Sequence, residues 1–576
     1  MHTFTVWSPK ARQVALQIGD RSYAMEHRDD GWWTRKVEEA KPGADYQYSL
    51  DEGKALPDPR SPWQPFGIDG PSRLVDHSRF RWTDVNWQPK PLSSAIIYEM
   101  HVGTFTPAGT FKSAIECLDY LVDLGITHVE LMPVAEFSGS WGWGYDGVDI
   151  YAPHHAYGPP DDLKAFVNAC HSKSLAVLLD VVYNHFGPAG NYIGEFGPYF
   201  TKAYHTPWGD AVNFDSAGSQ EVRGFFIENA RMWLRDYHFD GLRLDAVHAL
   251  VDKSAIHFLE QLSYEIDALA AHLGRHLVLI AESDLNDPRM VTSRDAGGYG
   301  IDAQWSDDFH HALHAIVTGE SNGYYEDFGT FQHLAKALRQ GYVYDGLYSA
   351  HRKRSHGRPV GRLSGHHLLG YSQTHDQVGN RAQGERLSQL ISTGRLKIAA
   401  ALVMTSPFIP MLFQGEEFGA STPFLYFTQH QEQELANSVS EGRRSEFKAF
   451  GWNPEEIPDP QEADTFERSK LRWSEIHEEP HASLLKWHKA LIQLRREHSE
   501  LTDGRMDEVE TAFDERAKWL RVRRGRVEVI CNLGTDRQAI PVTCGSGVLL
   551  VSEDTWQMRP GLIELPADSV AVLQDA

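Results

Sequence analysis

The chain has 576 residues, 41% of them hydrophobic and 23% charged, which is enough for about two to four domains with large apolar cores. Its 55 Lys and Arg against 79 Asp and Glu give a net charge of −24, which argues against nucleic acid or an anionic membrane as partner, because both need a basic surface. The acidic balance itself is interpreted as a solubility feature rather than as a sign of a cationic substrate.

Residues 1–90 are predicted to form a β-sandwich. Short β-rich runs at 4–7, 14–18 and 46–48 are separated by turn residues, and no long helical period interrupts them. The first strand pattern follows Met1 without a signal peptide, and no apolar run reaches membrane-spanning length, so we expect a cytoplasmic protein. The acidic segments described below lie outside this region, which is therefore expected to be accessory.

From residue 95 the pattern alternates between strands and helices. Eight strand candidates lie between residues 95 and 417, with helical patterns in most of the gaps. The run 175–182 is apolar on both faces, as in a parallel strand covered by helices. We therefore predict the α/β class, with a (β/α)8 TIM barrel over residues 91–495 flanked by N-terminal and C-terminal β-sandwich domains.

Two irregular segments interrupt the predicted barrel. Residues 185–222 are rich in Gly, Pro and Tyr and are expected to form a loop-rich excursion, and residues 421–475 are expected to form an insertion with a helix. After a helix around 482–497, short strand patterns return. A second β-sandwich is predicted for 496–576.

No metal or cofactor site is expected. The cysteines have no close metal-type spacing and are predicted to be buried free thiols: Cys117, Cys170, Cys531 and Cys544. The side-chain oxygen of Asn184 could ligate calcium, but no acidic loop of regular spacing accompanies it.

Three short acidic segments point to chemistry: GLRLDAVH at 241–248, LIAES at 279–283 and YSQTHDQVGN at 371–380. Each is interpreted as a buried strand running into a carboxylate, at Asp245, Glu282 and Asp376. In a barrel of parallel strands such ends converge on one rim. Two carboxyl groups can cleave a glycosidic bond when one is ionised and the other protonated. A glycoside-processing enzyme is the prediction.

The neighbours of these acids favour different roles for them. Arg243 and Asp245 alternate onto the same strand face, so the guanidinium is expected to keep that carboxylate ionised, as a nucleophile requires; the alternative is a structural ion pair. Glu282 emerges from an apolar run, which raises a carboxyl pKa and suits a general acid, although such glutamates also cap loops. Asp180, in the segment DVVYNH at 180–185, is expected to orient Arg243 or support its strand.

Four segments in this order, DVVYNH, GLRLDAVH, IAES and QTHDQ, resemble the signature regions of the α-amylase superfamily (glycoside hydrolase family 13). The resemblance implies that Asp245 is the nucleophile, Glu282 the general acid/base and Asp376 the transition-state stabiliser. It implies retaining cleavage of α-glucosidic bonds through a covalent glucosyl-enzyme. It also implies these contacts at the cleaved sugar: Tyr145 (in WGYDGVD), His185, Arg243 and His375.

Residues 4–16 resemble the early-set sandwich that precedes the barrel in branching and debranching enzymes. Other stretches resemble the trehalose-releasing hydrolases of that superfamily, namely residues 58–72, 281–289, 302–320, 384–388 and 465–475. This implies hydrolysis of the α-1,4 bond next to the terminal trehalose unit of maltooligosyltrehalose, giving trehalose and a maltooligosaccharide. The loop 307–311, expected after a strand, could bind the vicinal hydroxyls of trehalose, or could be a polar loop or helix cap. The remaining implied substrate contacts are His248, Asp307, Asp308, Phe309, His310, His311, Gln377 and Asn380.

Two other functions stay open on the sequence. A glycogen branching enzyme would share the sandwich and barrel but transfer glucan to an α-1,6 position. A non-catalytic glucan-binding protein would use the barrel as a scaffold, against which the complete set of acids argues. The expected ligands are maltooligosyltrehalose and α-glucan oligosaccharides, with a maltooligosyltrehalose synthase as a candidate pathway partner.

Overall fold

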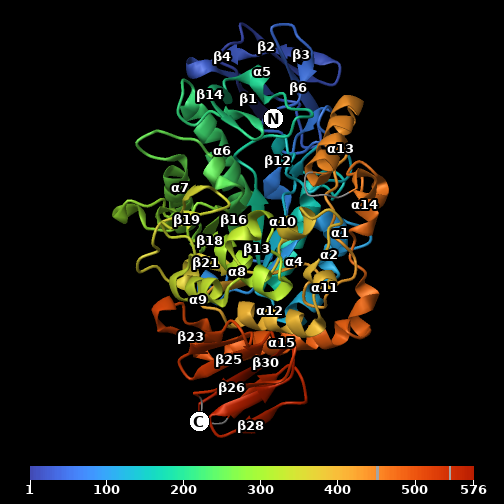
Figure 1. The fold of residues 1–576 in the computed structure, drawn as a ribbon. Coiled ribbons are helices and arrows are strands. Elements are labelled where there is room, and N and C mark those ends of the chain that lie inside the picture. The colour runs from blue at the N-terminus through green and yellow to red at the C-terminus, as the bar shows by residue number, and fades with distance from the viewer. Residues whose placement is uncertain (449–452, 544–546, 576) are drawn as a thin grey trace.

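The computed structural model describes residues 1–448, 453–543 and 547–575, so the predicted thiol of Cys544 lies outside it. The molecule is elongated, with the N-terminal strands at one end, a barrel in the middle and the C-terminal strands at the other end (Figure 1). Within the described part of the chain, Cys117, Cys170 and Cys531 are free thiols, and Cys117 is only half-buried.

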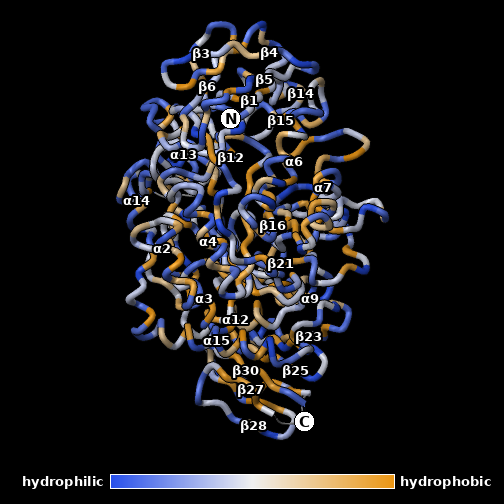
Figure 2. Tube along the Cα trace, turned by 180° about the vertical axis from the view of Figure 1, so that it is seen from behind, coloured by the Kyte–Doolittle hydropathy of each residue, from blue (hydrophilic) through white to orange (hydrophobic). Residues whose placement is uncertain are grey.

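The described residues form a closed barrel in which all neighbouring strands are parallel, as predicted. Every strand residue is buried, because helices cover the outside and side chains fill the interior. The tube in Figure 2 is apolar along much of this region. The strands are β9 (Ile97–Met100), β10 (His128–Leu131), β13 (Ala176–Val181), β16 (Gly241–Leu244), β17 (Val278–Ala281), β18 (Ala303–Trp305), β21 (Leu368–Gly370) and β22 (Ile409–Phe413).

The helices of the barrel follow the predicted apolar stripes. In α6 the residues Phe226, Ala230 and Trp233, which recur at helical spacing, are all buried, so the helix before β16 presents an apolar face to the barrel. The longer helices are α4 (Pro160–Ser172), α6 (Ser219–Asp236), α7 (Phe258–Leu273), α8 (Asp307–Thr318), α9 (Phe331–Gln340), α12 (Thr393–Thr405), α13 (Gln433–Lys448) and α15 (His481–Glu497). The shorter ones are α1 (Val102–Phe105), α2 (Phe111–Ile115), α3 (Leu118–Leu124), α5 (Ile193–Phe196), α10 (His375–Gly379), α11 (Leu387–Leu390), α14 (Ala463–Arg468) and α16 (Ser499–Thr502).

Two local predictions were wrong. Residues 307–311 do not form a loop but begin α8, because two acidic side chains in its first turn complement the helix dipole. The strand predicted to run into Asp376 ends at Gly370, and Asp376 lies on α10. There the Thr374 hydroxyl accepts a bond from the Asp376 backbone N–H at 3.2 Å and so starts a helix in place of the strand.

The loop-rich excursion contains more order than its sequence suggested. It includes α5 and an antiparallel hairpin of β14 (Phe200–Thr206) and β15 (Gly209–Val212). Other small pairs are β11 (Ala135–Glu136) with β12 (Asp149–Pro153), and β19 (Tyr348–Ser349) with β20 (Arg354–Ser355). No helix among the described residues is long and apolar enough to cross a bilayer.

β-sheets flank the barrel on both sides, as predicted. The N-terminal sheets contain β1 (His2–Trp7), β5 (Trp32–Val37) and β4 (Glu26–His27), and β3 (Arg21–Ala24), β2 (Val14–Ile18), β6 (Asp45–Leu50), β7 (Ala55–Leu56) and β8 (Ser72–Arg73). Trp7 of β1 meets Tyr199 of the excursion edge-on, with ring centroids 5.5 Å apart. The N-terminal sheets therefore contact the segment that carries the β14–β15 hairpin.

The C-terminal sheets pack on the barrel through α12, which contacts β25 and β30, and through α9, which contacts β23. One sheet contains β23 (Val509–Asp514), β24 (Trp519–Arg524), β25 (Val527–Asn532), β30 (Ser569–Gln574) and β27 (Gly547–Val551). The other contains β26 (Gln538–Pro541), β29 (Leu562–Leu565) and β28 (Gln557–Arg559).

Candidate active site

Two of the predicted acids directly follow barrel strands. The backbone N–H of Asp245, after β16, donates to Val181 O at 3.1 Å, and that of Glu282, after β17, donates to Leu244 O at 3.0 Å. Both residues thus continue the hydrogen-bond pattern of the barrel. Asp376 stands on α10, in the segment that follows β21. All three acids therefore lie on the rim at the carboxyl ends of the strands.

One guanidinium joins the first two acids to a third. Arg243 is 0% exposed; its Nη1 donates to Asp180 Oδ2 at 2.7 Å and to Asp245 Oδ1 at 2.9 Å. Its Nη2 lies 2.9 Å from Glu282 Oε2. This contact with Asp180 is the one expected if that residue orients Arg243. The Arg243 guanidinium also lies over the Trp305 ring, 4.3 Å from the ring centroid. The carboxylates bind the edge of the guanidinium and the indole covers its face, so the cation is held from both directions.

Asn184 holds the other side of Asp245. Its Nδ2 donates to Asp245 Oδ2 at 2.7 Å and to the Asp245 carbonyl at 3.0 Å. Its Oδ1 is 2.6 Å from Nδ1 of His185. Both carboxylate oxygens of Asp245 are thus held by donors, one from Arg243 on β16 and one from Asn184 in the segment after β13, and the Asn184 oxygen is already bound by an imidazole. Asp245 is therefore a carboxylate held in one orientation, as a nucleophile requires, rather than a mobile surface acid.

Glu282 lies in surroundings that favour its neutral form. Burial and the nearby Asp245 raise the pKa of Glu282, and the charge of Arg243 offsets this only in part. Its Oε2 also accepts the backbone N–H of Ala246 at 2.7 Å. Ala246 adopts a left-handed conformation with φ of 40°, which a residue with a Cβ seldom adopts. The strained turn after Asp245 therefore directs an N–H at the second acid.

His375, which directly precedes the third acid, is bound to Glu99 of strand β9. Its Nδ1 binds Glu99 Oε1, and its backbone N–H donates to Glu99 Oε2 at 3.1 Å. Burial opposes the charge, but Glu99 and Asp376 outweigh it and raise the pKa of His375 to about 9. The imidazolium then donates through Nε2 to the Tyr145 hydroxyl at 2.8 Å, and that hydroxyl donates to Asp180 Oδ2 at 2.6 Å. For Asp376 itself, burial raises the pKa and His375 opposes the rise.

At the start of α8, two adjacent acids face different surroundings. Asp307 is half-buried and accepts the Tyr371 hydroxyl at 2.5 Å, and burial raises the pKa of Asp307 to about 8. Asp308 is 2% exposed, and its Oδ2 accepts the backbone N–H groups of Val343 at 2.7 Å and Tyr344 at 2.8 Å. The Asp308 carboxylate is therefore occupied by the backbone of residues 343–344.

The next three residues of α8 are also enclosed. Phe309 is 0% exposed and packs against Phe408, with ring centroids 5.1 Å apart. His310 is 0% exposed, and its Nε2 lies 3.1 Å from the Tyr325 hydroxyl. His311 is 8% exposed, and burial lowers its pKa to about 3, which keeps it neutral.

Comparisons with known proteins place this chain in a family. Residues 76–205 match the family model described as "Alpha amylase, catalytic domain", and residues 504–572 match a domain of unknown function, DUF3459. Two curated relatives carry the name "Malto-oligosyltrehalose trehalohydrolase". The one from Rhizobium sp. (strain M-11) is 48% identical over 99% of this chain and 97% of its own, and the one from Mycobacterium tuberculosis (strain H37Rv) is 48% identical over 100% of both.

The chain belongs to the malto-oligosyltrehalose trehalohydrolase family.

Solved structures agree with this assignment at the level of the fold. A putative alpha amylase from Salmonella typhimurium superimposes with a TM-score of 0.92 at 37% identity, over 100% of this chain and 97% of its own. A pullulanase from Anoxybacillus sp. LM18-11 in complex with maltotetraose has a TM-score of 0.73 at 19% identity, over 100% of this chain and 86% of its own, and shows the shared fold alone. A 1,4-alpha-glucan branching enzyme from Pseudoalteromonas atlantica is only 29% identical, over 73% of this chain and 60% of its own.

The remaining predicted contacts of this trehalohydrolase-family chain surround the acids. His248 is exposed on a 3-10 turn (Val247–Ala249) after Asp245. Gln377 Oε1 accepts the Thr374 hydroxyl at 2.5 Å. Asn380 is exposed, and its Nδ2 lies 3.4 Å from Asp376 Oδ1. All three side chains belong to the segments that carry the acids.

Sequence reasoning missed two residues that contact the predicted site. Glu99 ends the buried strand run AIIYE, and an acid in that position was itself a signal, as it was for Asp245 and Glu282. Trp208 stands at the turn of the β14–β15 hairpin, 47% exposed, with its ring parallel to that of His185 at 4.6 Å. Nothing in the aperiodic segment 185–222 indicated that pairing.

Proposed function

We propose that the protein hydrolyses the α-1,4-glucosidic bond next to the terminal trehalose unit of maltooligosyltrehalose and releases trehalose and a maltooligosaccharide. The observation that carries the proposal is similarity that extends through the barrel and both sets of flanking sheets. Relatives 45% and 51% identical, covering 98% and 87% of their own lengths, carry the trehalohydrolase name. A barrel shared with amylases alone would leave the bond unspecified.

In the proposed reaction Asp245 attacks the anomeric carbon while neutral Glu282 protonates the leaving glycosidic oxygen. The glucosidic C–O bond breaks, and a covalent bond forms between Asp245 and the sugar. Glu282, now ionised, then removes a proton from water, which attacks the same carbon and releases Asp245. The fixed position of Asp245 and the raised pKa of Glu282 support this division of roles. Two displacements give retention of the α configuration.

Asp376 is proposed to stabilise the positive charge that develops on the sugar ring. The residues proposed to surround that sugar are Tyr145, His185, Arg243 and His375. Those proposed to contact the neighbouring units are His248, Asp307, His311, Gln377 and Asn380. Burial of Asp308, Phe309 and His310 favours a supporting role for these three, behind Asp307 and His311.

Two further assignments belong to this proposal. The substrate must come from an enzyme that converts the reducing end of an α-1,4 glucan into trehalose, so a maltooligosyltrehalose synthase is the proposed pathway partner. The proposed location of the protein is the cytoplasm. Cell fractionation and pull-down of the synthase test these assignments separately from the reaction.

The decisive experiment compares two matched substrates. The purified protein is incubated with maltohexaose and with the same oligosaccharide ending in trehalose, and the sugars released are separated and identified. Free trehalose from the second substrate alone is the expected result. New α-1,6 branches on a longer glucan would instead identify a branching enzyme, and absence of turnover would identify a glucan-binding protein. Asp245→Asn serves as the inactive control.

A further inference from the structure

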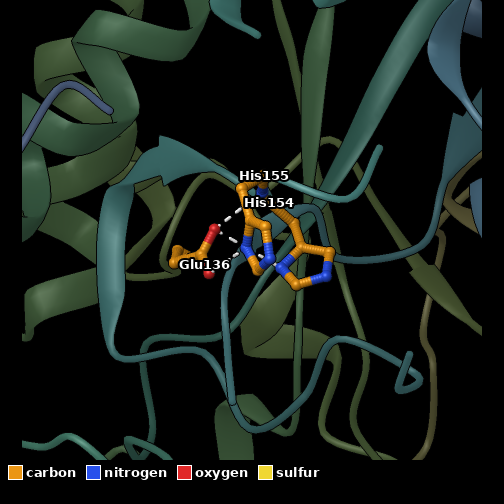
Figure 3. Close-up of side chains that lie close together, drawn as sticks. All are labelled: Glu136, His154 and His155. Atoms are coloured by element: carbon orange, nitrogen blue, oxygen red, sulfur yellow. Dashed lines mark hydrogen bonds and ion pairs between the residues drawn. The ribbon is translucent and has the colours of Figure 1, made fainter. Parts of the chain in front are cut away.

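Glu136, His154 and His155 converge outside the group of residues proposed for the reaction. Glu136 is the last residue of β11, and the two histidines directly follow β12, its antiparallel partner. One potential metal-ligating atom from each of the three lies within 4.8 Å of the other two. Figure 3 shows the two imidazole rings facing the carboxyl group from the opposite segment.

Packing against aromatic rings, rather than hydrogen bonding, orients His154 toward Glu136. It is 0% exposed and stacks on Phe137, with ring centroids 3.7 Å apart, while Tyr157 meets it edge-on at 4.9 Å. Its Nδ1 lies 3.4 Å from Glu136 Oε2, yet within the described chain neither of its ring nitrogens makes a hydrogen bond. A fully buried imidazole without such a partner is unfavourable, and a bound ligand would relieve that cost.

His155 and Glu136 complete a set with access from outside. The Nδ1 of His155 lies 2.7 Å from Glu136 Oε1, and the His155 backbone N–H donates to Oε2 at 2.7 Å. Glu136 is 0% exposed, whereas the side chain of His155 is 28% exposed. His155 lines a cavity of about 250 Å³ together with Phe66 and Gln429, which gives an ion a route to the cluster.

We propose that Glu136, His154 and His155 bind one divalent late transition-metal ion, with Zn²⁺ as the best-matched candidate. Two imidazoles and one carboxylate are a known zinc ligand set, with solvent in the fourth position. Zinc–ligand bonds of about 2.0–2.2 Å place tetrahedral ligands roughly 3.3–3.6 Å apart. Nδ1 of His154 lies 3.4 Å from one Glu136 oxygen and Nδ1 of His155 lies 2.7 Å from the other, and one ligand atom of each residue lies within 4.8 Å of the other two. Side-chain shifts on the order of 1 Å would bring the three onto one ion.

The site went unnoticed in the sequence because its ligands come from two strands. Glu136 and the adjacent pair His154–His155 do not share the i, i+4 spacing of a helical zinc motif, and only the β11–β12 pairing brings them together. The pairing also suggests a structural role for the ion. It would clamp both ends of the segment 137–153, and that segment carries Tyr145. A metal ion would therefore stiffen the support of one proposed sugar contact.

The test measures metal binding by the full-length protein after treatment with a chelator. Co²⁺ is titrated in, its visible absorption reports coordination by nitrogen and oxygen ligands, and Zn²⁺ is then used to displace it. The wild-type protein should bind one equivalent at this site. Glu136→Gln and His155→Ala should each weaken binding at least about 10-fold. His205→Ala removes a histidine that is 76% exposed and 3.5 Å from Asp210, and it should bind as the wild type does.

Thermal unfolding gives an independent measure. Zn²⁺ should raise the midpoint temperature of the wild type and of His205→Ala but not that of His155→Ala, because a ligand stabilises only the state that binds it. His155 is partly exposed, so its variant is expected to fold even if one at buried His154 does not. The proposal is overturned if folded wild type binds no equivalent of Co²⁺ or Zn²⁺. It is also overturned if His155→Ala and Glu136→Gln bind them as tightly as the wild type.

Discussion

Arg243 contacts three carboxyl groups with one rigid guanidinium, and each contact does a different task. Asp180 fixes the cation, Asp245 is held in the orientation that the proposed attack needs, and Glu282 is kept close to Asp245. A lysine could not reproduce these contacts, because its single ammonium lacks the planar set of donors. The sequence indicated the pair with Asp245 by alternation along the strand. It could not indicate the contact with Glu282, which arises because β16 and β17 are neighbours in the barrel.

Replacing Glu282 by Gln should leave substrate binding nearly intact and lower kcat by roughly 10²- to 10⁴-fold, because the leaving oxygen loses its proton donor. The wild-type rate should fall as pH rises through the raised pKa of Glu282, since the neutral form is the donor. Steady-state kinetics across pH check both statements. A substrate with a strongly acidic leaving group, which needs no proton, is the control. Near-normal hydrolysis of the natural substrate by the variant would contradict the assignment.

Replacing Glu99 by Gln tests the support of His375. The pKa of His375 is raised from 6.5 to about 9, so its charge stabilises the fold fully below about pH 6.5 and loses this effect as pH rises through about 9. The contribution is about 3 kcal/mol. Urea unfolding at both ends of that range should show the loss in the wild type and a much smaller change in Glu99→Gln. Glu38→Gln, whose side chain is 81% exposed, should behave as the wild type.

At the scale of elements, strands were predicted better than the segments that follow them. Long apolar runs such as 175–182 specify a buried strand whatever surrounds them. The segments that follow the strands are not specified in this way, because a few polar residues can either extend a strand or cap a helix. Asp307 and Asp376 both fell on helices for this reason. The β14–β15 hairpin escaped prediction because neither of its strands has an alternating apolar pattern.

The start of α8 offers a comparison of two adjacent acids. Asp308→Ala should destabilise the protein by on the order of 3 kcal/mol, because the backbone donors of Val343 and Tyr344 lose a charged acceptor. Asp307→Asn should change stability little, because the pKa of Asp307 is raised to about 8 and the group is mostly neutral at pH 7. It should instead raise KM. Thermal unfolding and kinetics of both variants separate the effects, and a stable Asp308→Ala protein would argue against the structural role.

At the scale of the whole molecule, the order of sheets and barrel followed from composition and periodicity, and the contacts between them did not. The boundaries near residues 90 and 495 stay a prediction. The packing of α12 against β25 and β30 depends on surfaces far apart in sequence. Arg524 is an example, because nothing in the sequence around it predicts that an arginine on a C-terminal strand is buried. Its Nη1 donates to the carbonyls of Thr405, Ser406 and Leu501 at 2.9, 2.8 and 3.0 Å.

Arg524→Ala should therefore loosen the C-terminal sheets from the barrel. Three buried carbonyls lose a charged donor, and we expect a loss of on the order of 3–5 kcal/mol, seen as a lower midpoint in thermal unfolding. Arg523 is the matched control on the same strand. It pairs with Asp575 at 3.1 Å with both side chains about 30% exposed, so its replacement by Ala should cost less than about 1 kcal/mol. Equal effects of the two variants would contradict the bridging role.

The crowding of acids around Arg243 and His375 has a consequence for inhibition. In the proposed reaction Asp180, Asp245 and Asp376 stand close to a sugar ring that is neutral in the ground state and positive in the transition state. A sugar mimic with a protonated ring nitrogen carries that charge permanently, so the pocket should prefer it to its uncharged analogue. Such an inhibitor would also bind an ordinary amylase. Selectivity would have to come from a second glucose unit on the inhibitor, joined as in trehalose, which only an enzyme that accepts a trehalose end should recognise.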